Sequence, residues 1–176
     1  MSTKTRFYSL AISLYTNPDD KGAAGKLFEV ACRSYTSGRA VTAIKTAGKV
    51  DAFITYADAE TGKRVSVRTE YKTGSGELKP ELFKADIIVY CPEVTFDIEA
   101  EDQAFVFTRD EFRAMLDNYP GRGKLVRYNS KRGVTQIQQF RTETSPTASA
   151  PMAAYLWECC YNKPTLREWI EEKRGA

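Results

Sequence analysis

Acidic and basic side chains share one face of a predicted strand, in an arrangement that can do chemistry. The stretch 65–76 begins with β-branched residues at every second position, which predicts a β-strand. Because strand side chains alternate between two faces, Glu70 and Lys72 point the same way. They lie at the end of the strand, beside a loop that contains Gly74 and Gly76. Chemistry at this point requires that other parts of the chain supply partners for this carboxylate and ammonium.

Two further acids are expected near this pair. The acid-x-Lys pattern alone is weakly specific, but the copy at Glu70 ends a predicted strand and follows a hairpin. The other strand of that hairpin, 50–56, begins with Asp51, so the two carboxylates can approach each other. A helix predicted over 20–35 carries Glu29 at the polar edge of its apolar stripe, and Glu29 can reach the same point.

The charges of these side chains predict a cation site. Glu29, Asp51 and Glu70 bring three negative charges and Lys72 brings one positive charge, which leaves minus two. Two carboxylates about 4 Å apart repel each other by roughly 4 kcal/mol at an effective dielectric constant near 20. Such a cluster must be protonated, separated or neutralised, and one divalent cation balances it. Carboxylate oxygens suit Mg²⁺, or Mn²⁺ in its place.

These segments resemble the PD-(D/E)xK nuclease superfamily. In that family a helix carries a Glu, a strand begins with the Asp, and the next strand carries Glu-x-Lys. The matching segments here are 25–29, 49–51 and 69–72, with Val50 where the family pattern has Pro. The resemblance covers residues 20 to about 107 and is greatest to the small Holliday-junction-resolvase-like and phage members.

The resemblance implies a metal-dependent endonuclease that hydrolyses DNA phosphodiester bonds with Mg²⁺ or Mn²⁺. It implies that Asp51, Glu70 and the Tyr71 carbonyl bind the metal, that Glu29 supports the metal or its water, and that Lys72 orients the nucleophile. Since no separate target-recognition domain is evident, we expect structure-selective or weakly sequence-specific cleavage. A homodimer would supply two sites for two strands. The alternative is a catalytically inactive nucleic-acid-binding or interaction module on the same fold.

Each proposed site residue also has a purely structural interpretation. Glu29 lies four residues before Arg33, the spacing of an ordinary helix ion pair. Asp51 can cap the turn that precedes its strand. Glu70 and Lys72 can belong to a solvated strand face. The functional interpretation is favoured over this one because Asp51 and Glu29 occur in the expected order.

The predicted fold is a single α/β domain. The resemblance implies a restriction-endonuclease-like core made of a helix, a three-strand meander, a helix and a strand, with a mixed sheet flanked by helices. We place this core at about 20–117 and a helical C-terminal extension at about 118–176. Strands are predicted over 40–45, 50–56, 65–72, 86–90, 104–107 and 134–140, and helices over 20–35, 80–84, 108–119, 152–161 and 166–173. Thr108 is predicted to cap the third of these helices, with Glu111 completing a capping box, and its core-facing residues are Phe112, Met115 and Leu116.

A basic segment between 121 and 133 predicts a second functional surface. Basic side chains spaced by Gly and Asn suit contact with a phosphate backbone, although the same composition fits a solvated loop. The predicted nucleic-acid contacts are Arg122, Lys124, Arg127, Lys131 and Arg132.

Composition excludes several other classes of site. The chain has 176 residues, a formal charge of +3 and no histidine, which excludes His-dependent triads and His-ligated zinc. None of its four cysteines forms a C-x-x-C pair, so a structural zinc site is not expected. No apolar run reaches membrane-spanning length and no signal-peptide pattern is present, so we expect a cytoplasmic protein without membrane contact.

Overall fold

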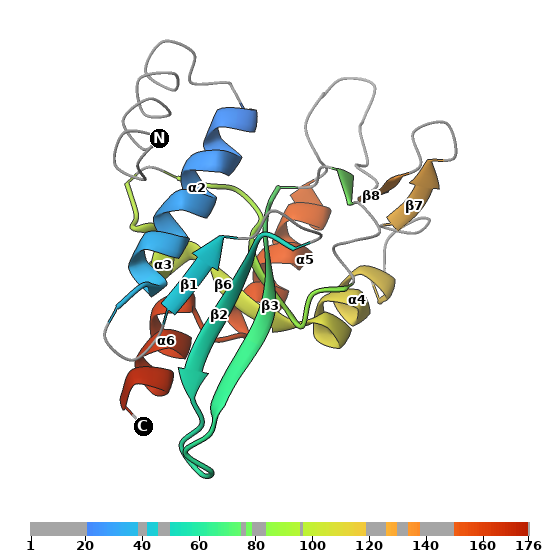
Figure 1. Ribbon diagram of the computed structural model, residues 1–176. Helices are drawn as coiled ribbons and strands as arrows, with labels where there is room; N and C mark the ends of the chain where they lie inside the picture. Colours follow the sequence, from blue (N-terminus) through green and yellow to red (C-terminus); the bar gives the residue numbers. More distant parts are fainter. Residues whose placement is uncertain are drawn as a thin grey trace.

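A five-stranded mixed sheet forms the centre of the computed structural model (Figure 1). Its order is β1 (Thr42–Lys45), β2 (Ala52–Ala57), β3 (Arg64–Thr73), β5 (Ile87–Cys91) and β6 (Phe105–Thr108). The first three strands form an antiparallel meander, β5 pairs in parallel with β3, and β6 is antiparallel to β5. The structure describes residues 21–38, 42–45, 50–74, 77–78, 84–95, 97–118, 126–129, 134–137 and 150–175.

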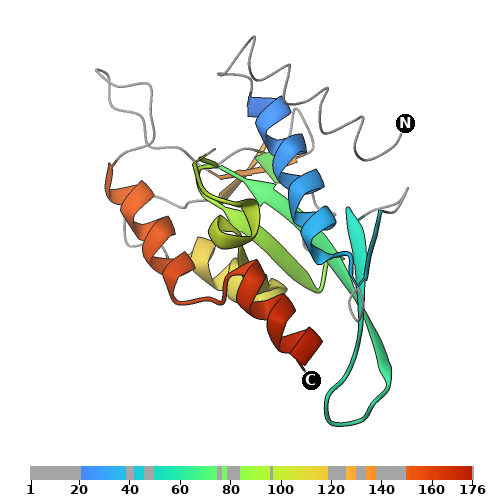
Figure 2. The ribbon, with the colours of Figure 1, turned by 90° about the vertical axis from the view of Figure 1, so that its left-hand side faces the viewer.

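Helices cover both faces of this sheet (Figure 2). Helices α2 (Lys21–Thr36), α3 (Ala100–Gln103) and α6 (Leu166–Gly175) lie on one face. Helices α4 (Arg109–Asp117) and α5 (Ala150–Tyr161) pack on the other, over β5 and β6. The α/β class predicted from the sequence is thereby confirmed, and both helices of the C-terminal extension contribute to the core.

The side chains of β3 alternate between the face of the sheet that α2 covers and the opposite face. Thr69 and Tyr71 are buried on the side of α2, where Tyr71 packs with Phe28 and Cys32. Glu70 and Lys72 therefore project from the opposite side of the strand. Strand β5 is buried along its whole length, as its continuous apolar sequence predicts for a central strand.

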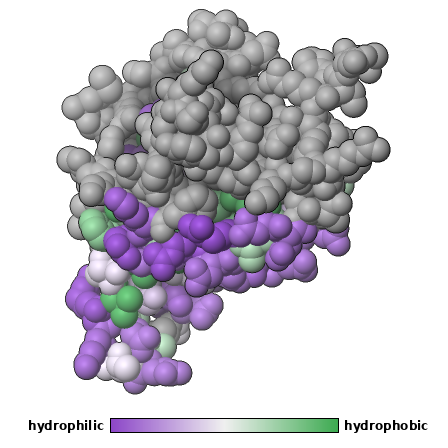
Figure 3. Space-filling model, turned by 90° about the vertical axis from the view of Figure 1, so that its right-hand side faces the viewer, coloured by the Kyte–Doolittle hydropathy of each residue, from purple (hydrophilic) through white to green (hydrophobic). Residues whose placement is uncertain are grey.

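The hairpin between β2 and β3 extends beyond the body of the sheet (Figure 1). An Asp58 carboxylate oxygen accepts hydrogen bonds from the backbone N–H groups of Glu60 and Thr61, at 3.0 and 2.8 Å. Gly62 follows with a φ of 67°, a left-handed conformation that favours glycine. These contacts hold the turn that sets the register of the two strands. Seen from the right-hand side of Figure 1, the described surface is mostly hydrophilic (Figure 3).

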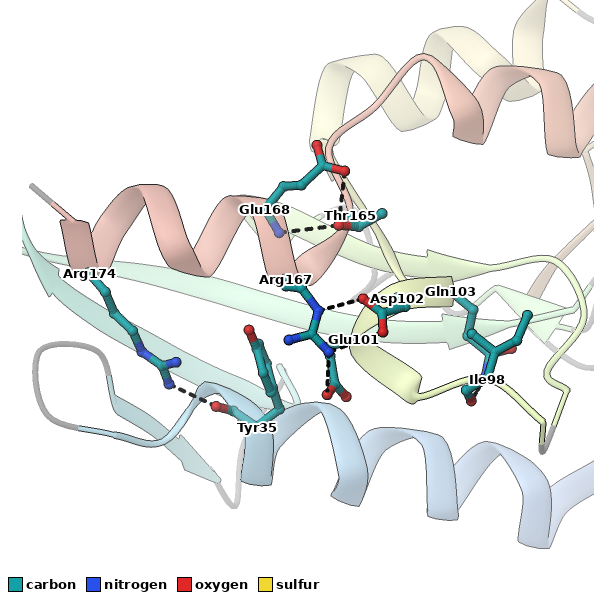
Figure 4. A network of polar contacts seen from close by, with 9 residues as sticks. All are labelled: Tyr35, Ile98, Glu101, Asp102, Gln103, Thr165, Arg167, Glu168 and Arg174. Atoms are coloured by element: carbon teal, nitrogen blue, oxygen red, sulfur yellow. Dashed lines mark hydrogen bonds and ion pairs between the residues drawn. The ribbon is translucent and has the colours of Figure 1, made fainter.

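Polar contacts tie α6 to α2 and α3 (Figure 4). The Arg167 guanidinium donates hydrogen bonds to Asp102 and Glu101 of α3, the shortest at 2.6 Å. Arg174 donates to the backbone carbonyls of Tyr35 and Thr36, at 2.9 and 3.2 Å. Since these carbonyls belong to the last turn of α2, Arg174 caps the helix that carries Glu29.

Most predicted elements are confirmed, with small shifts at their ends. The predicted capping box of α4 is present, with Thr108 and Glu111 each accepting a backbone N–H of the other. Phe112, Met115 and Leu116 are buried as expected. The predicted helix at 80–84 and the segment 138–140 of the last predicted strand lie outside the described residues, apart from Lys84.

The segment 121–133 corrects one expectation. No strand is predicted there, but Val126–Asn129 forms strand β7, which pairs with β8 (Val134–Ile137). Strand β4 (Glu77–Leu78) completes this three-stranded sheet. The β-branched and aromatic residues of β7 are interspersed with Arg and Asn, so its alternating pattern was masked by charge. Among the described helices, none combines the length and apolar character needed to cross a membrane.

Candidate functional site

The meander brings Asp51 and Glu70 together. Ala52 pairs with Thr69 in the antiparallel register, so Asp51 and Glu70 are the next residues on their strands. Their carboxyl groups share a hydrogen bond, although they are separated by 18 intervening residues in the chain. The expectation that these two acids meet at one point is met in the structure.

Backbone hydrogen bonds hold Asp51 in place. Its Oδ2 atom accepts the backbone N–H of Tyr71 at 2.9 Å, and its own N–H donates to the Thr69 carbonyl at 3.1 Å. The carboxylate of Asp51 is thus anchored to the strand that carries Glu70. Such an anchored acid can present its remaining lone pairs to a ligand without losing much side-chain entropy.

Burial and neighbouring acids raise the pKa of Glu70 from 4.5 to about 9. The largest cause is desolvation of its carboxyl group, followed by the negative charge of Asp51 and by their mutual hydrogen bond. The charge of Glu29 is the smallest of the causes that raise this pKa, and Glu29 lies on α2, which covers the face of the sheet opposite to the one from which Glu70 projects. At neutral pH the Asp51–Glu70 pair therefore holds a proton that two separate carboxylates would release.

Lys72 extends from β3 two residues beyond Glu70. It is half-buried, and the alternation of the strand places it on the same face as Glu70. Its backbone pairs with Tyr90 of the buried strand β5. The ammonium is consequently attached to a rigid, central part of the sheet.

Glu29 is buried on α2 and forms an ion pair with Arg33. The Arg33 Nη1 atom lies 3.1 Å from Glu29 Oε1, and both side chains are 10% exposed. The Lys26 ammonium lies 3.8 Å from the other oxygen, Oε2, and its side chain is 57% exposed. The helix ion pair considered from the sequence is therefore present. Removing one partner of such a buried pair typically costs about 3–5 kcal/mol, because the other charge is left uncompensated.

Another ion pair borders the site and was missed by the sequence reasoning. The Asp86 carboxylate binds the Arg68 guanidinium, at 2.8 and 3.2 Å, and the Arg68 backbone N–H at 2.8 Å. These hydrogen bonds from Arg68 lower the pKa of Asp86. The available signal was the position of Arg68, two residues before Glu70 and on the same face. Because Asp86 is committed to Arg68, it is not a fourth acid of the candidate site.

The predicted phosphate contacts, apart from the backbone of Arg127, lie outside the described residues. Arg127 is in strand β7, where only the backbone is described. Arg122, Lys124, Lys131 and Arg132 lie outside the described residues.

The donor set at the site consists of oxygen atoms. Within the described ranges, no three His, Cys, Asp or Glu side chains form a group that could hold a metal ion. Two carboxylates in contact, one anchored by backbone hydrogen bonds and the other with a pKa raised by burial, are nevertheless donors of the kind that Mg²⁺ and Mn²⁺ prefer. The proton held by the pair is what a bound cation would replace.

Comparisons with known proteins assign no function to this site. Comparison of the chain with protein-family models, with curated proteins and with solved structures finds no match.

Proposed function

We propose that this chain is a divalent-cation-dependent endonuclease that hydrolyses DNA phosphodiester bonds. The observation that carries the proposal is the contact between Asp51 and Glu70, in which burial and like charge raise the pKa of Glu70 to about 9. A strained pair of carboxylates with a lysine beside it is typical of functional sites and uncommon on an ordinary strand face. We further propose that α2, the β1–β2–β3 meander and β5 form a restriction-endonuclease-like core.

The residues of the site would have different roles in the reaction. Asp51 and Glu70 would hold Mg²⁺ or Mn²⁺, together with the Tyr71 carbonyl that the resemblance implies. The cation would supply Lewis-acid stabilisation of a phosphoryl oxygen as that oxygen gains charge. Lys72 would donate hydrogen bonds to the attacking water or to the scissile phosphate, and so orient the two for an in-line reaction.

Cleavage is best tested by nicking of supercoiled plasmid in the presence of Mn²⁺. We expect nicking by the wild type and a loss of about 100-fold or more in Lys72→Ala, since positioned proton donors and acceptors contribute factors of this size. Lys63→Ala provides a matched control, because Lys63 is exposed in the hairpin before β3 begins, seven residues before Glu70. Linear and branched DNA tested in parallel would reveal any selectivity for DNA structure.

Two results would contradict the proposal. Equal nicking by the wild type and by Lys72→Ala would show that Lys72 takes no part in the chemistry, provided that circular dichroism shows the variant to be folded. Absence of nicking and of any Mn²⁺-dependent thermal shift, with DNA binding retained, would establish instead the inactive nucleic-acid-binding module.

A further inference from the structure

The outward face of the β2–β3 hairpin leads away from the Asp51–Glu70 pair in successive rows. Residues that lie opposite each other on antiparallel strands share a face of the sheet, and so do residues two apart along one strand. The rows that continue the face of Asp51 and Glu70 are Phe53 with Arg68, Thr55 with Ser66, and Ala57 with Arg64. We call these six residues the hairpin face. At about 3.3 Å per residue, Arg68 lies about 7 Å and Arg64 about 20 Å along β3 from Glu70.

The hairpin face is open to solvent, although it belongs to the central sheet. The alternate residues of β2 and β3, such as Ile54 and Val67, pack with the residues of α2 and α6. On the side of the hairpin face, α4 and α5 pack over β5 and β6. Arg64, Ser66 and Arg68 are exposed, and Phe53 is 38% exposed. A ligand at the Asp51–Glu70 pair can therefore extend over the hairpin face.

The polar groups of the hairpin face suit a phosphate backbone. The six residues include two arginines and no acid. Thr55 and Ser66 share a hydrogen bond at 3.2 Å, and such a pair of hydroxyl groups retains one hydrogen that can be donated to a phosphate oxygen.

The two arginines differ in what they offer to a phosphate. Asp86 accepts hydrogen bonds from Nε and Nη2 of Arg68, which occupies two of its five N–H groups and fixes the orientation of the guanidinium. The Arg68 side chain is still 46% exposed, so it presents oriented donors whose charge is balanced by Asp86. The net positive charge of the hairpin face therefore comes from Arg64.

Phe53 is the residue that contact with phosphates alone does not explain. It lies in the row next to the Asp51–Glu70 pair, and the buried residues Ala52 and Ile54 hold it on a rigid strand. An aromatic ring beside basic side chains is the combination with which proteins bind single-stranded nucleic acid, because the ring stacks on an unpaired base. Bases inside a duplex are stacked on one another and do not offer a face to such a ring.

We infer that the hairpin face binds a single strand of DNA beside the scissile bond, with Phe53 stacked on an unpaired base and with Arg64 and Arg68 in contact with phosphates. This inference rests on the proposed function, because it takes DNA as the partner of the cation site. It narrows the substrate to single-stranded DNA or to DNA with an unpaired segment next to the cleavage position.

Fluorescence anisotropy in the presence of a chelator measures binding without cleavage. The probes are a labelled oligothymidylate and the same strand annealed to oligoadenylate. Phe53→Ala should weaken binding of the single strand by about fivefold or more and binding of the duplex by about twofold at most, because stacking needs an unpaired base. Phe53→Leu keeps the apolar bulk and should have the same effect if Phe53→Ala fails to fold. Tyr161→Ala is the matched control, since Tyr161 is a 70% exposed aromatic residue on α5, and it should change neither affinity by more than about twofold.

The salt dependence of binding tests Arg64 independently. For single strands, each phosphate contact contributes about 0.7 to the slope of log K against log salt concentration. Arg64→Ala should reduce this slope by about 0.7, whereas Phe53→Ala should leave it unchanged. Lys26→Ala is the control for loss of one positive charge, since Lys26 is exposed on α2 at the opposite face of the sheet, and it should leave the slope unchanged.

The possible failures are distinguishable. A folded Phe53→Leu variant that binds the single strand as the wild type does, or that loses single-strand and duplex binding equally, would overturn the inference. An unchanged slope in Arg64→Ala would overturn it as well, and so would a wild type that does not bind oligothymidylate. Nicking of plasmid with Mn²⁺ by the same preparation would then show that the proposed function stands without the hairpin face. The expected binding pattern without nicking would uphold the hairpin face and refute the endonuclease.

Discussion

Replacing Glu70 by glutamine should stabilise the cation-free protein at high pH. A carboxyl group whose pKa is raised from 4.5 to about 9 on folding is kept protonated in the folded state and ionised in the unfolded state. Between these values the unfolded chain binds fewer protons, so the free energy of unfolding decreases as the pH rises. Glu70 thus contributes no destabilisation below its unfolded pKa and its full destabilisation above its folded pKa. Glutamine is neutral at every pH and removes this term.

The size of the effect follows from the same values. The full difference between pKa 4.5 and about 9 corresponds to about 6 kcal/mol at 1.36 kcal/mol per pH unit. Solvent reaches part of the carboxyl group, and screening by water reduces the interaction to roughly a third of that figure. We therefore expect Glu70→Gln to be more stable than the wild type by about 2 kcal/mol at pH 8 and about equally stable at pH 4.

Urea unfolding in the presence of a chelator measures this difference. Wild type, Glu70→Gln and Glu60→Gln should be compared at both pH values, so that other titrating groups cancel in the differences. Glu60 is exposed in the hairpin turn, and its replacement should change stability by about 0.5 kcal/mol or less. If Glu70→Gln is no more stable than the wild type at pH 8, Asp51 and Glu70 are not a destabilised pair, and the physical basis for a cation site is lost.

Three further predictions concern the frame of the site. Arg174→Ala should lower the free energy of unfolding by about 2 kcal/mol in urea titrations, because two hydrogen bonds to the last turn of α2 are lost; retention of wild-type stability would show that this cap is unimportant. Gly62→Ala should cost about 1 kcal/mol from backbone strain alone, since its φ is 67° and no atom lies within 4 Å of the added Cβ; a loss no larger than for a control variant at the exposed Glu60, Glu60→Ala, would contradict this. Asp86→Asn should cost about 0.5–1 kcal/mol at pH 7, because the pair with Arg68 is partly exposed. Since Arg68 lowers the pKa of Asp86, this contribution is present above the ordinary Asp value of 3.8 and is lost as the pH falls below it; an Asp86→Asn deficit that persists unchanged at pH 2.5 would refute the assignment.

Local patterns were sufficient for most of the secondary structure. The alternation of Val65, Val67 and Thr69 predicted β3, and the capping box at Thr108 predicted the start of α4. Strand β7 and the short helix α3 were not predicted. Both are only four residues long, and their place depends on pairing or packing with distant segments.

The side chains of the candidate site were predicted to converge, and Asp51 and Glu70 do so. Their meeting was foreseeable because a short hairpin leaves few possible registers for two adjacent strands. The position of Arg68 on the face of Glu70 was a signal for its ion pair with Asp86, but the sequence could not identify the partner, because Asp86 follows a crossover whose length does not define the register of β5 with β3.

The sequence by itself determined which residues share a face, since that depends only on the two-residue period of a strand and the 3.6-residue period of a helix. It thereby determined the strand that carries Glu70 and Lys72 and the helix that carries Glu29. Only the tertiary structure decided which charges are buried together. Burial raises the pKa of Glu70 through its contact with Asp51, and burial of Glu29 beside Arg33 makes their ion pair costly to break. The strength of an interaction between charges depends on how much water surrounds them, and that is defined only when the whole chain has packed.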